Sequence, residues 1–470
     1  MLAEFPVTKV LGFLAEAHLL PAILFRTARK QCDGDVLRLM RARSAVLEKS
    51  SQQALIQEVY RFIEQYSVPK DVIVGHPHYH VLVATGCGAH HAGQLLVWRL
   101  LLEELMSRGF LRLMIATGTV AAGVDFPARS VVITAHSKRG AEGFNTLSSS
   151  EFQQMSGRAG RRGKDNVGFC LIAPGVFSDA RVLDEVAKKP PEPLRSAYFA
   201  SPSTVLNLLK FRTADDLRYT VQKSLASFLD YKAAQALRRE AAEQEAKINA
   251  GRALSQTDKH KALKTVRRKI REAQALEERQ IVLLERTLSG LEKLGYLADN
   301  HLTEKGYWAA HLCTSLVLEL GEAISEFLFD DLSVYEVVGL VASLAGDPHR
   351  PYLSIRQNPI KPELFKRLQE ILERIRSVYE SPYSAEVAVL PNAALTVVTW
   401  MEAESWTEFS SLLRLGGVAD GDAARLIMQT GEHLGQISRL YETHPELSRL
   451  AAEGRRAILK PPLSDDTLVD

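Results

Sequence analysis

The 470-residue sequence has little cysteine and no long apolar run. Its four cysteines lie far apart and form no CxxC pair, which argues against a disulfide framework or a zinc ribbon and favours a reducing, cytoplasmic location. No apolar stretch reaches the roughly 18 residues that a transmembrane helix needs, so no membrane contact is expected. The net charge of +2 identifies no class of partner, because binding to a polyanion would depend on local clusters of basic residues.

The first 175 residues alternate between strand and helix patterns. A short apolar run predicts a buried strand at 20–25, and similar runs predict further strands at 113–116, 131–134 and 168–172. Amphipathic stretches, such as 95–106, separate them and predict helices. This alternation is typical of an α/β lobe with a parallel sheet, and such sheets bind ligands at the carboxyl ends of their strands.

Most of the remaining sequence has a helical period. Residues 176–231 are mixed and then helical, and 291–470 are helical apart from a short wing-like turn at Asp299 and Asn300. Residues 232–290 differ, because they are rich in charge and contain no aromatic residue and no proline. Apolar residues spaced by three and four predict an antiparallel helical arm there.

A basic run lies within that arm. Residues 259–271 hold seven lysines and arginines and no acidic residue. Such a run is either a solvated helix face or a contact for nucleic acid or another partner. The sequence leaves both interpretations open.

The most specific motif is QMSGRAGRRG, which begins at Gln154. Its spacing predicts Arg158 and Arg161 on one face of a short helix, and Gly157 and Gly160 would let that face approach another surface closely. The planar guanidinium fits phosphate oxygens. An arginine so placed can accelerate phosphoryl transfer by about 10³–10⁵-fold, so the motif indicates phosphoryl-transfer chemistry.

A second motif directly follows the predicted strand at 113–116. The hydroxyls of Thr117 and Thr119 are expected to hold backbone phosphates of a nucleic acid. Gly123 and Asp125 lie in the following turn, where we expect them to reach a nucleotide. The motif becomes specific through its position upstream of Gln154.

A third motif, GCGAHHAG, is interpreted as a loop. Its histidines, His90 and His91, can donate hydrogen bonds to a phosphate or a base. Just upstream, histidines at 76, 78 and 80 alternate, which would place them on one face of an extended strand in a geometry that suits zinc. We weighed that alternative and expect no metal site.

These motifs, in this order, resemble the second RecA-like lobe of superfamily-two DExH-box helicases, in particular the Ski–Mtr branch associated with RNA exosomes. The resemblance extends along nearly the whole chain. It divides the chain into a second RecA-like lobe (1–175), a winged-helix domain (176–231 with 291–309), a helical hairpin arm (232–290) and a DSHCT-like helical domain (310–470). The implied fold is a RecA-like α/β lobe followed by mostly α-helical domains.

The resemblance also implies roles for individual residues. Arg158 and Arg161 would be arginine fingers, and Gln154 would contact the γ-phosphate or the attacking water. ATP would be bound through Gly123, Asp125 and Gly157. The implied nucleic-acid contacts are His90, His91, Gly93, Thr117, Thr119 and Arg29.

The family hydrolyses ATP with Mg²⁺ between two lobes, and the first lobe carries a GxxxxGK[ST] P-loop and a DExH box. Neither motif occurs in this sequence. The chain is therefore interpreted as a C-terminal fragment, as a subunit that receives its P-loop lobe in trans, or as a degenerate relative. We expect the chain on its own to be inactive as an ATPase.

The resemblance predicts an ATP-dependent helicase that moves 3′ to 5′ on single-stranded nucleic acid, with RNA favoured over DNA and RNA-decay factors as partners. Two alternatives remain open. The chain could be a non-catalytic nucleic-acid-binding scaffold, or a DNA-directed relative.

Overall fold

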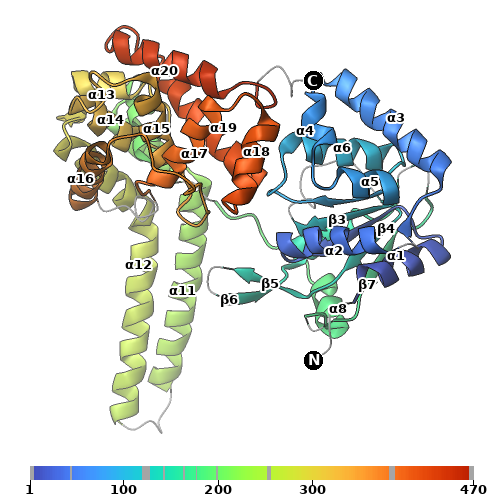
Figure 1. Cartoon of the computed structure of the whole chain (residues 1–470). Helices are drawn as coiled ribbons and strands as arrows, with labels where there is room; N and C mark the ends of the chain where they lie inside the picture. The colour runs from blue at the N-terminus through green and yellow to red at the C-terminus, as the bar shows by residue number, and fades with distance from the viewer. Residues whose placement is uncertain are drawn as a thin grey trace.

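The computed structural model describes residues 5–42, 45–118, 128–140, 143–161, 163, 165–175, 177–196, 199–250, 256–379 and 387–464. Its N-terminal part is an α/β lobe built on a five-stranded sheet with strand order β2-β3-β1-β4-β7, in which all neighbouring strands are parallel (Figure 1). The strands are β1 (Ala22–Arg26), β2 (Cys87–His90), β3 (Leu113–Thr117), β4 (Ser130–Ile133) and β7 (Phe169–Ile172).

Helices cover both faces of this sheet. Alternate strand residues such as Leu24 and Ile115 pack with α1 (Val7–Glu16) and α2 (Arg29–Arg41) on one face. Ile23 and Met114 point to the other face, against helices that include α3 (Lys49–Gln65) and α6 (Leu96–Ser107). Strands buried on both sides need continuous apolar runs, which is why β1, β3 and β4 could be predicted from the sequence.

One local prediction in the lobe was wrong, and one alternative that we weighed does not match the structure. The GCGAHHAG segment is not only a loop, because its first half forms β2, paired with β3. The histidines at 76, 78 and 80 do not alternate along a strand, because His78 is the N-cap of α5 (Tyr79–Thr85) and His76 lies in the turn after α4 (Lys70–Val74). The zinc geometry that we weighed for them therefore does not form.

An antiparallel hairpin follows β4. It consists of β5 (Ser137–Gly140) and β6 (Gly143–Thr146) and leads into α7 (Ser149–Ser156). Ser148 begins α7 with a capping box, in which its hydroxyl accepts from the backbone N–H of Glu151 and the Glu151 carboxylate accepts from the backbone N–H of Ser148. Helix α8 (Ala180–Lys188) follows the last strand.

The chain then forms a small helical unit with a two-stranded wing. Its helices are α9 (Pro202–Leu209), α10 (Ala214–Gln222) and α13 (Glu304–Ala309), and its wing is β8 (Leu297–Ala298) with β9 (His301–Leu302). The wing turn predicted at Asp299 and Asn300 is confirmed, since both residues have positive φ angles, of 49° and 63°.

Two long helices, α11 (Leu225–Ala250) and α12 (Gln256–Lys293), project from this unit as an antiparallel pair (Figure 1). Ala241, Ile248 and Val266 form a small apolar cluster between them. Ion pairs between Arg238 and Glu277 and between Lys269 and Glu240 tie the two helices together. The helices extend beyond the range 232–290 that the sequence suggested for the arm.

The C-terminal part is a bundle of seven further helices within the described residues. They are α14 (Val317–Ser325), α15 (Val334–Ala345), α16 (Pro362–Val378), α17 (Pro391–Glu402), α18 (Trp406–Leu415), α19 (Asp420–Ile437) and α20 (Pro445–Ile458). At its centre Trp400 is fully buried and donates from its indole N–H to the carbonyl of Ile458 at 2.7 Å. None of the helices in the described ranges combines the length and apolar character that crossing a bilayer requires.

Candidate functional site

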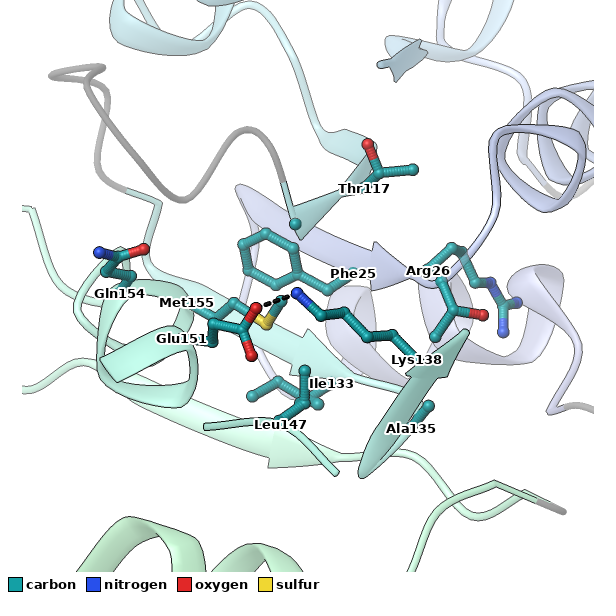
Figure 2. A pocket seen from close by; sticks show the side chains of 12 residues that line it. Phe25, Arg26, Thr117, Ile133, Ala135, Lys138, Leu147, Glu151, Gln154 and Met155 are labelled. Atoms are coloured by element: carbon teal, nitrogen blue, oxygen red, sulfur yellow. Dashed lines mark hydrogen bonds and ion pairs between the residues drawn. The ribbon is translucent and has the colours of Figure 1, made fainter. Parts of the chain in front are cut away.

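A pocket of about 340 Å³ opens where the carboxyl ends of β1, β3 and β4 meet α7 (Figure 2). Thr117 at the end of β3 and Gln154 on α7 both line it, so the structure brings together two of the predicted site residues. Phe25, near the end of β1, and Met155 on α7 form an apolar part of the pocket wall. The pocket lies on the edge of the sheet where parallel α/β folds bind ligands.

One charged pair crosses this pocket. Lys138 on β5 donates to the carboxylate of Glu151 on α7 (Figure 2). Burial by itself would raise the pKa of Glu151, but the hydrogen bonds from Lys138 and Ser148 outweigh it and hold the pKa below its usual value. Glu151 is therefore a carboxylate at neutral pH, and Lys138 is the cation nearest to it.

The arginine motif is not helical, and this part of the prediction was wrong. Helix α7 ends at Ser156, and Gly157 is its C-cap. Arg158 and Arg161 follow in an irregular segment, where Gly160 has a φ of +95°. A positive φ ends the helical path between the two arginines, so they do not share a helix face.

This segment, residues 157–161, is held in place by its backbone, and we call it the arginine loop. The N–H of Ala128 donates to the carbonyl of Arg158 at 2.9 Å, and the N–H of Gly160 donates to the carbonyl of Ala128 at 2.7 Å. On its other side, a Cβ on Gly168 would lie 2.4 Å from the carbonyl oxygen of Ala159. The chain therefore needs glycine at 168 to bring the loop against the start of β7.

The side chain of Arg161 has a defined partner. It makes a two-pronged contact with Asp165, from Nε to Oδ2 at 2.7 Å and from Nη2 to Oδ1 at 3.0 Å. Gln154 is exposed at the rim of the pocket. Thr119, Gly123 and Asp125, which were predicted to hold phosphate and nucleotide, lie outside the described residues.

The two histidines of the third motif point into the protein. His90 and His91 are each 3% exposed. His90 Nε2 lies 2.6 Å from Glu103 Oε1, and His91 Nε2 lies 3.0 Å from Asp33 Oδ1. The N–H of Gly93 donates to His91 Nδ1, so the proton of a neutral His91 sits on Nε2 and is donated to Asp33. In this conformation neither ring faces a ligand.

Burial keeps the neighbouring histidines neutral. It lowers the pKa of His76 to about 3, and it also lowers the pKa values of His78 and His90. His76 stacks on Trp98 with ring centroids 3.7 Å apart and contacts Gln94 Oε1 at 2.8 Å. Within the described ranges, no group of three His, Cys, Asp or Glu side chains is arranged to hold a metal ion.

The same loop binds the C-terminal bundle. Arg29, predicted to contact nucleic acid, instead donates to Asp422 on α19 at 2.7 Å. The N–H of Gly421 donates to the carbonyl of Gly93 at 3.0 Å, and Thr407 on α18 donates to Asp71 on α4 at 2.6 Å. Of the predicted nucleic-acid contacts, Arg29 and Gly93 therefore lie at an interface between the lobe and the bundle, whereas His90 and His91 pair within the lobe.

Several residues of the site were missed at the sequence level. Lys138 lies in the β5–β6 hairpin, and no motif assigned this side chain a role. Asp33 and Asp422 act through partners distant in sequence. Asp165 could have been found, because an acidic residue four positions after Arg161 is well placed to pair with it.

Comparison with known families identifies the bundle. Residues 299–465 match the model of the DSHCT (NUC185) domain. The match begins at the turn of the β8–β9 wing and runs through α20. It covers the region that carries the buried tryptophan Trp400.

Comparison with individual proteins gives the wider relationship. The chain is 30% identical over 228 residues to the exosome RNA helicase MTR4 of Mus musculus, which is 48% of this chain and 22% of that protein. These matches support a relationship of the chain to the C-terminal part of Ski–Mtr-type DExH-box helicases. Other Ski–Mtr-type matches are the chloroplastic DExH-box ATP-dependent RNA helicase DExH15 of Arabidopsis thaliana, 32% identical over 203 residues (43% of this chain, 17% of that protein), and the probable helicase HelY of Mycobacterium tuberculosis, 27% identical over 220 residues (47% and 24%).

The Ski–Mtr relationship concerns the C-terminal part of the family's architecture. The matched region spans about a fifth of the length of these relatives. An α/β lobe on a parallel sheet followed by helical domains agrees with the fold class predicted from the sequence.

Proposed function

We propose that this chain is the arginine-bearing half of an ATP-dependent helicase that moves 3′ to 5′ on single-stranded RNA. The observation that carries the proposal is the arginine loop, which is fastened to Ala128 just before β4 and directly follows α7, the helix that carries the pocket residue Gln154. A pure binding module has no need for two arginines in a loop held by its own backbone. ATP and RNA are the ligands that the relatives' names indicate.

ATP hydrolysis by this mechanism would require a second protein lobe. The sequence has no GxxxxGK[ST] motif, so we propose that a P-loop lobe, in cis or in trans, holds most of the triphosphate and its Mg²⁺. Arg158 and Arg161 would then reach the transferring phosphoryl group when the lobes close, and Gln154 would orient the attacking water. Closure and release on hydrolysis would move the strand, which this chain would grip through phosphate contacts and base stacking. RNA-decay factors are the partner class that we propose for the assembled helicase.

The purified 470-residue chain is expected to show no ATP hydrolysis above background, because two arginines cannot replace the phosphate cradle. Hydrolysis should appear when a P-loop lobe is added. Turnover by the chain alone, abolished by Arg158→Ala, would contradict the proposal. If the two halves associate and hydrolysis never appears, the chain is a scaffold instead. Competition between RNA and DNA strands of matched sequence, at stated salt, tests the RNA preference.

The basic run on α12 is proposed as an additional nucleic-acid contact. Lys264 and Arg268, and likewise Arg267 and Arg271, are like-charged neighbours four residues apart, an arrangement that destabilises a helix by a few tenths of a kcal/mol per pair. All four side chains are exposed. Arg268 also lies 3.6 Å from Glu272 within α12, in an exposed i,i+4 pair, whereas Lys269 pairs with Glu240 across the two helices of the arm.

Changing these four residues to glutamate is expected to weaken RNA binding by the chain about tenfold or more and to flatten its salt dependence, because fewer phosphates are neutralised. Lys269 stays unchanged, so the arm keeps its ion pair. Fluorescence anisotropy over a salt series measures both effects. Reversing Lys366 and Arg449, exposed on the bundle, is the matched control. Equal RNA binding by the two variants would show that the basic run on α12 is a solvated helix face and does not contact RNA.

A further inference from the structure

The carboxylate of Asp165 accepts hydrogen bonds from two arginines. Besides the fork from Arg161, it accepts from the backbone N–H of Arg161 at 3.0 Å and from Arg129 Nη1 at 3.0 Å. Its side chain is 1% exposed. The hydrogen bonds from Arg161 hold the pKa of Asp165 well below its usual value, so this group is ionised.

The two hydrogen bonds to Asp165 occupy one edge of the Arg161 guanidinium and leave its second edge available. Nε and Nη2 point to Asp165, and within the described residues Nη1 has no acceptor. A guanidinium is planar and can bind acceptors along two edges. Because Asp165 fixes the plane of the group, it also fixes the direction in which Nη1 points. The Arg161 side chain remains 25% exposed, so this second edge can be reached.

Arg129 balances the charge of this arrangement. A lone carboxylate beside an arginine finger would repel the triphosphate that the finger must bind. With Arg129 attached to the same carboxylate, the three side chains carry a net positive charge. Arg129 stands directly after Ala128, whose backbone holds the arginine loop, so the cluster and the loop form one unit.

We propose that Asp165 is a positioning residue for hydrolysis: it orients Arg161 so that the guanidinium edge bearing Nη1 meets the transferring phosphoryl group. This inference rests on the proposed function, in which Arg161 is an arginine finger. Asp165 itself does not touch the nucleotide. Its effect on the rate passes entirely through Arg161.

A purely structural role is the competing explanation. The N–H of Asp165 donates to the carbonyl of Arg161 at 2.9 Å, so the residue also closes a turn. Asp165→Asn keeps the backbone turn and one oxygen acceptor but cannot receive both prongs of the fork. Asp165→Glu keeps the charge and displaces the carboxylate by one methylene.

The test measures ATP hydrolysis by the helicase assembled from this chain and its P-loop lobe. Asp165→Asn is expected to lower kcat about 10–100-fold, the typical cost of a misplaced catalytic group, with the KM for ATP, the RNA affinity and the Tm nearly unchanged. Asp165→Glu should lie between this variant and the wild type. The double variant Arg161→Ala with Asp165→Asn should be no slower than Arg161→Ala alone, because both changes remove one function. Asp184→Asn, which affects an exposed i,i+4 ion pair on α8, is the control.

A second readout needs no nucleotide. In ¹H–¹⁵N spectra of the isolated chain, the Arg161 Nε–H should exchange slowly with water and should exchange rapidly in Asp165→Asn. Wild-type kcat in both Asp165 variants, with Arg161→Ala inactive, would overturn the positioning role and leave the proposed function standing. Hydrolysis that survives Arg161→Ala would instead contradict the proposed function. If Asp165→Asn fails to fold, Asp165→Glu decides by the same criteria.

Discussion

Arg161→Ala is expected to lower ATP hydrolysis by the assembled helicase about 10³–10⁵-fold, the range that arginine fingers contribute to phosphoryl transfer. RNA affinity should stay within a few fold of the wild type. The guanidinium is turned toward Asp165 and the arginine loop, and Arg161 is not among the residues that line the pocket with Thr117. Steady-state hydrolysis and anisotropy on the same preparations separate the two effects.

The matched control for this experiment is Arg181→Ala, which removes an arginine from the surface of α8 and should leave the rate unchanged. If Arg161→Ala lowered RNA affinity as much as it lowered hydrolysis, Arg161 would be a strand ligand and not a finger. Arg158→Ala in parallel shows whether the two arginines of the loop act as a pair, since the losses of paired fingers would not add.

Gly421→Ala is expected to separate the lobe from the C-terminal bundle. A Cβ at this position would lie 2.4 Å from the carbonyl oxygen of Ala92 and 2.6 Å from that of Gln94, and backbone atoms cannot move aside as a flexible side chain can. The substitution should also weaken the hydrogen bond to Gly93 and the nearby ion pair between Arg29 and Asp422. We expect a loss of about 1–3 kcal/mol at this interface.

Calorimetry should then resolve two unfolding transitions in place of one, and small-angle scattering should show a larger radius of gyration. Gly435→Ala in the same helix is the control, because a Cβ there would approach only the flexible side chain of Arg455, at 3.3 Å. A single transition at the wild-type temperature for Gly421→Ala would show that the contact with the lobe tolerates a shift.

The elements of the fold that could be predicted most completely are those whose burial produces a clear run of apolar residues in the sequence. β1, β3 and β4 are mostly apolar because helices cover both faces of the sheet. β2 was missed because CGAH contains a glycine and a histidine, and the pairing with β3 outweighs its low strand propensity. The end of α7 was missed because a positive φ at Gly160 is a property of the loop's contacts as much as of glycine.

The candidate site was harder to predict because its partners are distant in the chain. The pattern of His90 and His91 suits a ligand-binding loop, but Glu103 and Asp33 take up their ring nitrogens in the fold. The partner of Arg29 is 393 residues away, and no spacing rule could reveal it. Thr117 and Gln154, for which different ligands were predicted from the sequence, line one pocket in the fold.

The contact between Gly421 and Gly93 has a mechanical consequence. It couples the lobe to the C-terminal bundle, whose α14 contacts the small helical unit from which α11 and α12 project, so a rotation of the lobe would be carried to the arm (Figure 1). With 38 residues, α12 is about 57 Å long. A lobe rotation of about 5° would displace its far end by about 5 Å, close to one nucleotide of an extended strand. A closure of the lobes of the kind proposed above would thus move the basic run on α12.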